Sequence, residues 1–133
     1  MFIKEILKYD YNYAEYVVSD NKNELICMCL SVPLPNGQPP MLNMKVKMIY
    51  AFSIRDIEIK LIESDHDKNI KIIHDDYFAY TLTAKVLDAN KSLVCLDEII
   101  ISLENDFPEG FPKNISNSDY IQFHVDRLDC ELN

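Results

Sequence analysis

Apolar and polar residues alternate along most of the chain, which is the period of a β-strand with one buried face. Residues 1–8 are ambiguous, because their apolar positions fit either a short helical face or a strand. Helical periodicity is otherwise weak, so the sequence predicts an all-β protein. The strands are expected at residues 13–18, 24–30, 45–54, 57–61, 77–86, 92–96, 99–103, 121–125 and 128–132.

The alternation changes phase twice, each time beside one of the protein's two arginines. Even-numbered positions are apolar from 46 to 54, and odd-numbered ones from 57 to 61. Odd positions are apolar from 121 to 125, and even ones from 128 to 132. One extra residue in a strand has this effect, so we expect a β-bulge at each break, fixed by an arginine–aspartate ion pair. The predicted bulge residues are Arg55, Asp56, Asp126 and Arg127.

Three loops separate the predicted strands, at residues 32–40, 63–69 and 108–118. The first contains four of the six prolines, and the third has room for one turn of helix. Bulges bend strands, and a small sheet that closes on itself needs such bends. We therefore expect a small closed or partly open barrel, like the oligonucleotide/oligosaccharide-binding (OB) fold, with a two-sheet sandwich as the alternative.

The length of the chain fits a single domain, residues 1–133. Two weakly similar halves are recognisable within it, at about 11–62 and 77–132, each a hairpin followed by a proline-bearing loop and a long strand. The similarity rests on residues 21–27 (NKNELIC) and 90–95 (NKSLVC). Because the match is short and needs a gap, chance is an alternative explanation.

Charge is distributed unevenly along the chain. The net charge is −9, and residues 97–133 hold nine acidic residues against two basic ones. Phosphate groups are anionic, so such a surface disfavours nucleic acid and anionic membranes as partners. A basic protein is the favoured partner, whereas solubility alone is the simpler explanation of the acidity. The candidate contact residues are Asp97, Glu98, Glu104, Asp106, Glu109, Asp126, Asp129 and Glu131.

The sequence shows no motif for a cofactor. It has two glycines, far apart, and no glycine-rich phosphate loop, so we expect no bound cofactor. Cys27 and Cys29 lie in an apolar stretch, while Cys95 and Cys130 stand alone, which favours reduced core cysteines over a zinc site or disulfides. No secretory signal or bilayer-spanning apolar run is recognisable, so we expect a cytoplasmic protein.

Two histidine–aspartate pairs are the main candidates for chemistry. His74 and Asp76, like His124 and Asp126, are two residues apart and would point to the same side of a strand. Imidazole and carboxylate groups together can bind a metal or move protons. Both pairs are also simply interpreted as solvent-facing polar residues, so they are weak candidates for a metal site.

These observations rank three functions. The first is a non-enzymatic acidic binding module that engages a basic protein partner, as an immunity or inhibitor protein does. The second is an OB-type domain that binds oligonucleotide or oligosaccharide, which the fold and the tyrosines at positions 9, 11 and 13 suggest. The third is a small enzyme that uses the histidine–aspartate pairs.

Overall fold

The computed structural model describes residues 1–10, 12–29 and 37–132, and these residues confirm the all-β prediction. They form eleven strands and one turn of 3-10 helix, η1 (Asp65–Asp67). The strands are β1 (Phe2–Asp10), β2 (Tyr13–Ser19), β3 (Glu24–Cys29), β4 (Val46–Phe52), β5 (Lys60–Ile62), β6 (Lys71–His74), β7 (Tyr80–Asp88), β8 (Leu93–Leu96), β9 (Ile99–Ser102), β10 (Tyr120–Val125) and β11 (Arg127–Leu132).

The strands form one mixed sheet in the order β1-β2-β3-β11-β4-β9-β8-β7-β10-β5, and β6 pairs with β7 beside this path. Among the described strands, β3–β11 and β4–β9 are the parallel pairs. The sheet is not closed, because β1 and β5 end the path. The pairing by itself establishes neither a barrel nor a sandwich.

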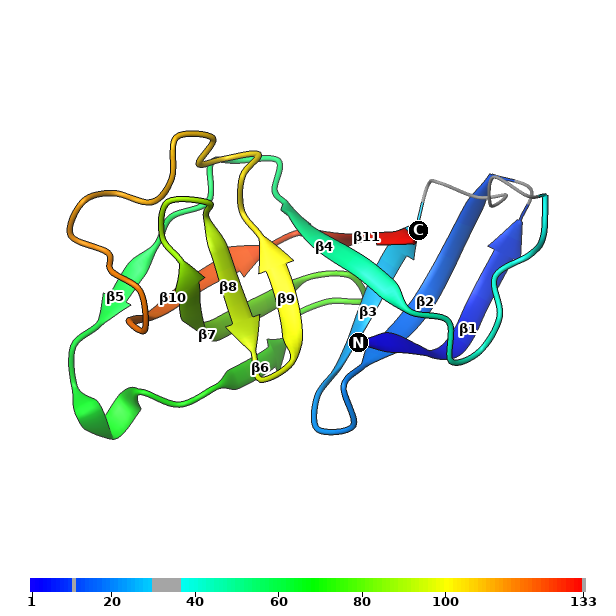
Figure 1. Ribbon diagram of the computed structural model, residues 1–133, viewed down its shortest axis with the longest axis horizontal. Coiled ribbons are helices and arrows are strands. Elements are labelled where there is room, and N and C mark those ends of the chain that lie inside the picture. The colour runs from blue at the N-terminus through cyan, green and yellow to red at the C-terminus, as the bar shows by residue number, and fades with distance from the viewer. Residues whose placement is uncertain (11, 30–36, 133) are drawn as a thin grey trace.

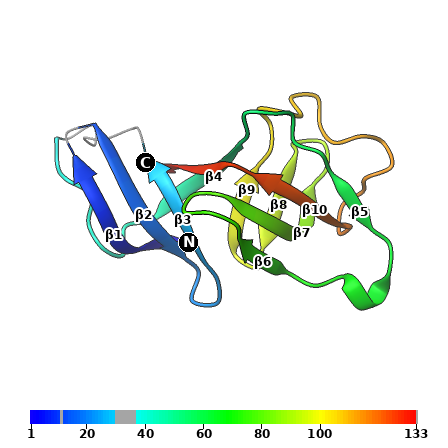
Figure 2. The same ribbon diagram turned by 180° about the vertical axis from the view of Figure 1, so that it is seen from behind.

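Two regions of the molecule are joined by one strand pair (Figures 1 and 2). We call β1, β2 and β3 the N-terminal sheet, and the group from β5 to β10 the second region. Strands β4 and β11 run between the two and pair antiparallel along their length, from Arg127 opposite Phe52 to Leu132 opposite Val46. The whole molecule is therefore elongated along this pair.

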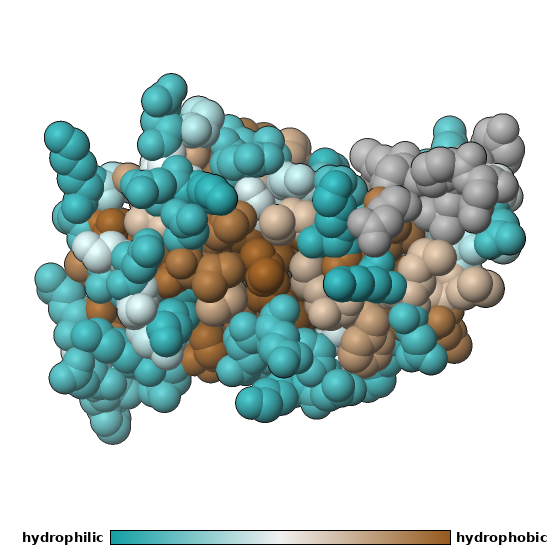
Figure 3. Space-filling view, in the orientation of Figure 1, coloured by the Kyte–Doolittle hydropathy of each residue, from teal (hydrophilic) through white to brown (hydrophobic). Residues whose placement is uncertain are grey.

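Alternate side chains of the strands meet in an apolar core. In β7 the buried residues include every even-numbered position from Tyr80 to Val86, and in β11 they are Leu128, Cys130 and Leu132, as the sequence pattern predicts. Apolar side chains also reach the surface near the middle of one face, surrounded by hydrophilic residues (Figure 3). Burial of this kind is the main favourable contribution to folding.

Strand β4 buries the face opposite to the predicted one. Ile49 and Ala51 are fully buried, whereas Phe52 is exposed. The register of β4 against β11 shifts at Lys47, which has no partner residue in β11. Such a bulge transfers every residue beyond it to the other face of the sheet. The predicted even-numbered buried face is therefore wrong beyond Val46.

No bulge is found at Arg55 and Asp56, which corrects the first predicted phase break. β4 ends at Phe52, and residues 53–59 have no regular structure before β5 begins at Lys60. The side chains of both Arg55 and Asp56 are exposed. The parity change in this segment reflects a loop between two strands rather than an extra residue in one strand.

The second phase break is a change of partner strand. β10 pairs with β7 and ends at Val125, and β11 pairs with β4 from Arg127 onward. Asp126 is the single residue between them. Arg127 forms its ion pair with Asp129, through Nε–Oδ1 and Nη2–Oδ2 distances of 2.7 and 3.1 Å, and not with Asp126. The position of the break was predicted correctly. The predicted bulge and the predicted Arg127–Asp126 ion pair were wrong.

The remaining predictions divide into confirmed elements and corrections. Hairpins β2–β3 and β7–β8 are confirmed, and residues 2–8 belong to strand β1. β6 was not expected, and residues 108–118 contain no helical turn. Much of the predicted loop 32–40 lies outside the described residues. The similarity of the two halves stays a prediction.

None of the four cysteines, all of which are described, forms a disulfide. Cys27, Cys29 and Cys130 are buried, and burial raises the pKa of the Cys27 thiol above its ordinary value. A thiol held protonated is a poor nucleophile and a poor metal ligand. Across residues 1–10, 12–29 and 37–132, no helix is long and apolar enough to cross a membrane.

Candidate functional site

A groove of about 720 Å³ lies beside the junction of β10 and β11. Residues 53–60, which follow β4, form one side of it, and β7 and β10 form the other. We call it the His124 groove. The charged and titratable residues that line it are Arg55, Asp56, Glu58, Lys60, His124 and Asp126.

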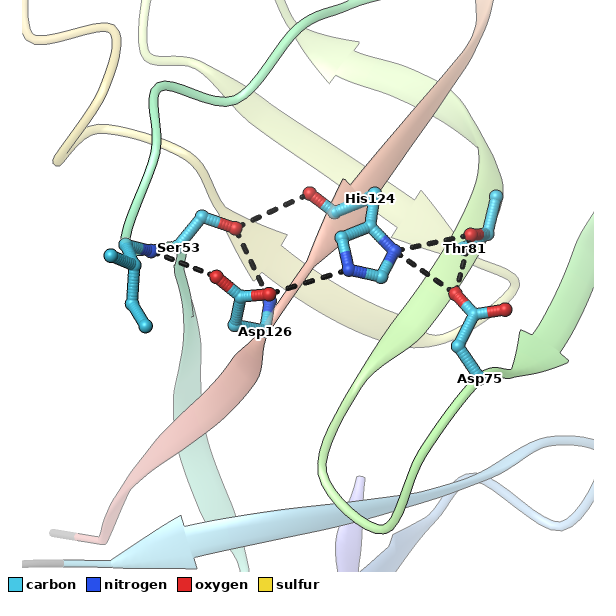
Figure 4. Close-up of polar contacts among 6 residues, drawn as sticks. Ser53, Asp75, Thr81, His124 and Asp126 are labelled. Carbon is cyan, nitrogen blue, oxygen red and sulfur yellow. Dashed lines mark hydrogen bonds and ion pairs between the residues drawn. The ribbon is translucent and has the colours of Figure 1, made fainter.

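The His124 imidazole is held at the groove by a hairpin (Figure 4). His124 lies in β10 opposite Thr81 of β7, and Asp75 follows the end of β6. Nδ1 of His124 is 2.9 Å from Oδ2 of Asp75 and 3.3 Å from Oγ1 of Thr81. The Thr81 hydroxyl donates to the same Asp75 oxygen at 2.6 Å. Since that oxygen only accepts, Nδ1 must supply the hydrogen of its own bond to Asp75.

The other ring nitrogen faces a carboxylate in the groove. Nε2 of His124 is 3.4 Å from Oδ1 of Asp126. When the hydrogen of a neutral imidazole is on Nδ1, Nε2 is an acceptor. Two acceptors then face each other, and this arrangement is favourable only if a proton or a donor from another molecule lies between them.

Asp126 is fixed by its backbone and by its second carboxylate oxygen. Its N–H donates to the carbonyl of Phe52 at 3.0 Å and to Oγ of Ser53 at 3.2 Å. Oδ2 accepts the N–H of Ile54 at 2.8 Å. The Ser53 hydroxyl donates to the carbonyl of His124 at 3.5 Å. The chain after β4 is thereby pinned to the β10–β11 junction, which shapes one wall of the groove.

The rim of the groove combines charge with an apolar side chain. Asp56 and Glu58 are exposed, as are Arg55 and Lys60. Ile54 is 86% exposed, the most exposed large hydrophobic residue among those described. An isoleucine in this position contributes nothing to the core of the chain.

The first predicted histidine–aspartate pair does not converge. Nε2 of His74 lies 2.9 Å from the carbonyl of Tyr77, and its ring stacks on Tyr80 with 4.6 Å between centroids. Asp76 accepts the N–H of Tyr77. Both residues therefore shape the β6–β7 hairpin. Over the described part of the chain, no group of three His, Cys, Asp or Glu side chains is arranged to hold a metal ion.

The hairpin between β6 and β7 also contacts the N-terminal sheet. The Tyr77 phenol donates a hydrogen bond to the Glu15 carboxylate, and this contact raises the pKa of Tyr77. The hydroxyl of Tyr80 accepts the N–H of Ile26 in β3 at 2.9 Å. Because Asp75 belongs to the same hairpin, the position of the His124 ring depends on how the two regions are joined.

The predicted acidic contact residues lie on several elements of the fold. Asp97 and Glu98 lie in the turn between β8 and β9, where the Asp97 side chain accepts a hydrogen bond from Asn23. Asp106 accepts the N–H of Ile57 at 2.6 Å. Asp97 and Glu98 thus share one turn, and Asp106 lies after β9.

Two more of them belong to ion pairs on the strand pair. Asp129 binds Arg127, and Glu131 lies 3.3 Å from Lys47 while accepting the Tyr50 hydroxyl at 3.1 Å. Glu104 and Glu109 are exposed. The structure therefore brings His124 together with Asp126, and the acidic contact set as a whole stays a prediction.

Sequence reasoning missed Asp75, Thr81, Ser53 and Ile54. Asp75 stands between the paired residues His74 and Asp76, but strand parity placed it on the other side. Its role depends on β6 ending at His74, where the chain turns toward β10. The signal that could have found Ile54 is its position beside a phase break.

Comparison with known proteins gives no relative from which a function could be transferred: no family model, no curated protein and no solved structure matches this chain.

Proposed function

We propose that this protein is a non-enzymatic binding module that engages a basic protein partner, as immunity or inhibitor proteins do, and that the His124 groove is its contact site. One observation carries the proposal. The groove joins three carboxylates, Asp56, Glu58 and Asp126, to an apolar residue that the fold leaves exposed, Ile54.

The charge of the whole chain supports a basic partner. A net charge of −9 attracts cationic proteins at long range and accelerates their encounter. Exposed Glu104 and Glu109 add to this field. The four cysteines without disulfides fit a reducing compartment such as the cytoplasm, where we place the interaction.

The fold proposed for this module is a partly open barrel. Strands β10 and β11 are separated by Asp126 alone, so together they are one bent strand. The pairing from β4 through β9, β8 and β7 starts and returns on this bent strand. A ring of this kind favours the OB-like barrel over the sandwich, with β1, β2 and β3 added outside it.

An enzyme is the second candidate, because one carboxylate orients His124 while the other ring nitrogen faces the groove. That is the arrangement of a general base. Two hydroxyls line the groove wall: that of Ser53 donates to a backbone carbonyl, and that of Thr81 donates to Asp75. Among the described residues of the groove, neither hydroxyl donates to Nε2 of His124, and we favour binding.

Nucleic acid is a weaker alternative. Aromatic stacking platforms for single strands work together with a positive groove. The His124 groove offers Arg55 and Lys60 against three carboxylates. An electrophoretic shift of single-stranded DNA or RNA at low salt would overturn the protein-partner proposal.

The proposal is tested by nuclear magnetic resonance with 15N-labelled protein and two peptides. One alternates arginine with alanine, and its control has glutamate in place of arginine. We expect the basic peptide to shift the amide signals of residues 53–60 and 122–126, with affinity that falls as salt is added. Equal shifts with the acidic peptide, or none with either peptide, would contradict the proposal.

A further inference from the structure

We infer that the His124 groove binds a guanidinium group, the side chain of an arginine on the basic partner, whose N–H groups donate to Nε2 of His124 and to Oδ1 of Asp126. The inference rests on the proposed function and deepens it by naming the chemical group that the site recognises. Its basis is the hydrogen-bonding state of two residues on the groove wall.

Every other polar atom of this pair has a partner. Nδ1 of His124 donates to Asp75 at 2.9 Å, and Oδ2 of Asp126 accepts the N–H of Ile54 at 2.8 Å. What remains is Nε2 facing Oδ1 at 3.4 Å. Both are acceptors when the ring is neutral, so a single group with two donors can bond to both of them at once.

A guanidinium supplies that donor better than an ammonium does. It is planar and presents parallel N–H groups in a fixed fork, so two of them can reach neighbouring acceptors at once. An ammonium is a compact, strongly hydrated charge and loses more hydration on entering a groove. The aliphatic part of an arginine side chain can lie along Ile54, which is 86% exposed at the rim.

The receiving groups are held in place before the ligand arrives. Asp75 and Thr81 fix the orientation of the imidazole, and the N–H of Ile54 fixes the carboxylate. Fixed groups do not need to be ordered on binding, which lowers the entropy cost of forming the complex. The groove lining carries three carboxylates, those of Asp56, Glu58 and Asp126, against the two basic groups of Arg55 and Lys60.

Fluorescence anisotropy with labelled peptides tests the inference. Three peptides of one length alternate alanine with arginine, with lysine or with citrulline, the uncharged analogue of arginine. We expect the arginine peptide to bind about tenfold more tightly than the lysine peptide, and the citrulline peptide to bind weakest.

Asp126→Asn is the decisive variant, and Asp88→Asn is its matched control. Both remove one negative charge, but Asp88 lies at the far end of β7 and bonds only to backbone N–H groups of its own turn. We expect Asp126→Asn to lower the affinity for the arginine peptide about tenfold and to abolish the preference for the arginine peptide over the lysine peptide. Asp88→Asn should change neither the affinity nor the preference. If Asp126→Asn does not fold, His124→Ala tests the same site, because it leaves the Ile54 contact intact.

The outcomes separate the two levels of the argument. If arginine and lysine peptides bind equally and both Asn variants behave like the unsubstituted protein, the guanidinium site is wrong, although the basic-partner proposal stands. If none of the basic peptides binds at low salt, both are wrong. Loss of arginine preference confined to Asp126→Asn or His124→Ala supports both.

Discussion

Asp20 at the β2–β3 turn and Asp126 at the β10–β11 junction are both aspartates at a bend, but their surroundings differ. Asp20 is 5% exposed, and its two oxygens accept the N–H groups of Lys22, Asn23 and Glu98 at 2.8–2.9 Å. Asp126 has a side chain 39% exposed and uses one oxygen for a backbone N–H. Its other oxygen faces a histidine nitrogen in a groove.

This difference distinguishes a carboxylate that stabilises the fold, that of Asp20, from one that can bind a ligand, that of Asp126. Burial by itself raises the pKa of Asp20, but the N–H groups of Asn23, Lys22 and Glu98 together outweigh burial and hold that pKa below its ordinary value. All of that carboxylate's hydrogen-bonding capacity stabilises the fold, including the contact between the N-terminal sheet and the β8–β9 turn. At Asp126, by contrast, Oδ1 accepts no backbone N–H group, so it can accept a hydrogen bond from a ligand.

The largest effect is expected from Asp20→Ala. It leaves three backbone N–H groups without an acceptor, and we expect a loss of about 3 kcal/mol in the free energy of unfolding, measured by urea denaturation. Asp88→Ala is the matched control for this loss in stability. Asp88 accepts two N–H groups in an exposed turn, so its loss should cost about 0.5 kcal/mol. Equal losses for both variants would contradict the structural role of Asp20.

The pH dependence of stability should also depend on Asp20. Because its pKa is lowered in the folded state, its stabilisation is fully present above the ordinary value of 3.8 and is lost as the pH falls through the lower, folded value. The stability difference between the protein and Asp20→Asn should therefore shrink below pH 3.8. Urea denaturation at a series of acidic pH values measures it, and a constant difference would be inconsistent with the lowered pKa.

A smaller effect on stability is expected from Asp126→Asn. The amide oxygen can still accept the Ile54 N–H, so we expect the free energy of unfolding to change by no more than about 1 kcal/mol, despite the loss of peptide binding. Urea denaturation checks this against binding measured on the same sample. A destabilisation as large as that of Asp20→Ala would make Asp126 a structural acid too.

The smallest effect is expected from Asp75→Asn, since Asp75 is a positioning residue that acts through His124. Binding of the arginine peptide should weaken by about threefold, or about 0.6 kcal/mol. The ring should also begin to exchange its hydrogen between Nδ1 and Nε2, which side-chain 15N signals report. Weaker binding with an unchanged ring tautomer would contradict the positioning role.

Much of the fold followed from the sequence because alternation reports burial directly. In β7 and β11 the predicted faces are the buried ones, because the extra residue of the β4–β11 pair is on β4 and that of the β7–β8 pair follows Val86. The prediction of the buried face of β4 failed because a bulge at Lys47 reverses the two faces of the strand. Neither the local sequence pattern nor the composition marks that residue. The break at Asp126 was visible, but a change of partner strand looks like a bulge when only one strand is seen.

The candidate site was half predictable for the same reason. His124 and Asp126 are neighbours along one strand path, so parity brought them together. Asp75 comes from a hairpin 49 residues away and reaches His124 only through the pairing of β6, β7 and β10. Contacts of that kind depend on the arrangement of strands and leave no local signature.

The measurement that tests the central claim most directly is the 15N spectrum of the His124 ring at mildly alkaline pH, with and without the arginine peptide. We predict a hydrogen on Nδ1 and none on Nε2 in the free protein, and a shift of Nε2 with little change at Nδ1 when the peptide binds. A hydrogen on Nε2 in the free protein, or an Nε2 signal that does not shift when the peptide binds, would contradict the claim that Nε2 accepts a hydrogen bond from the arginine side chain.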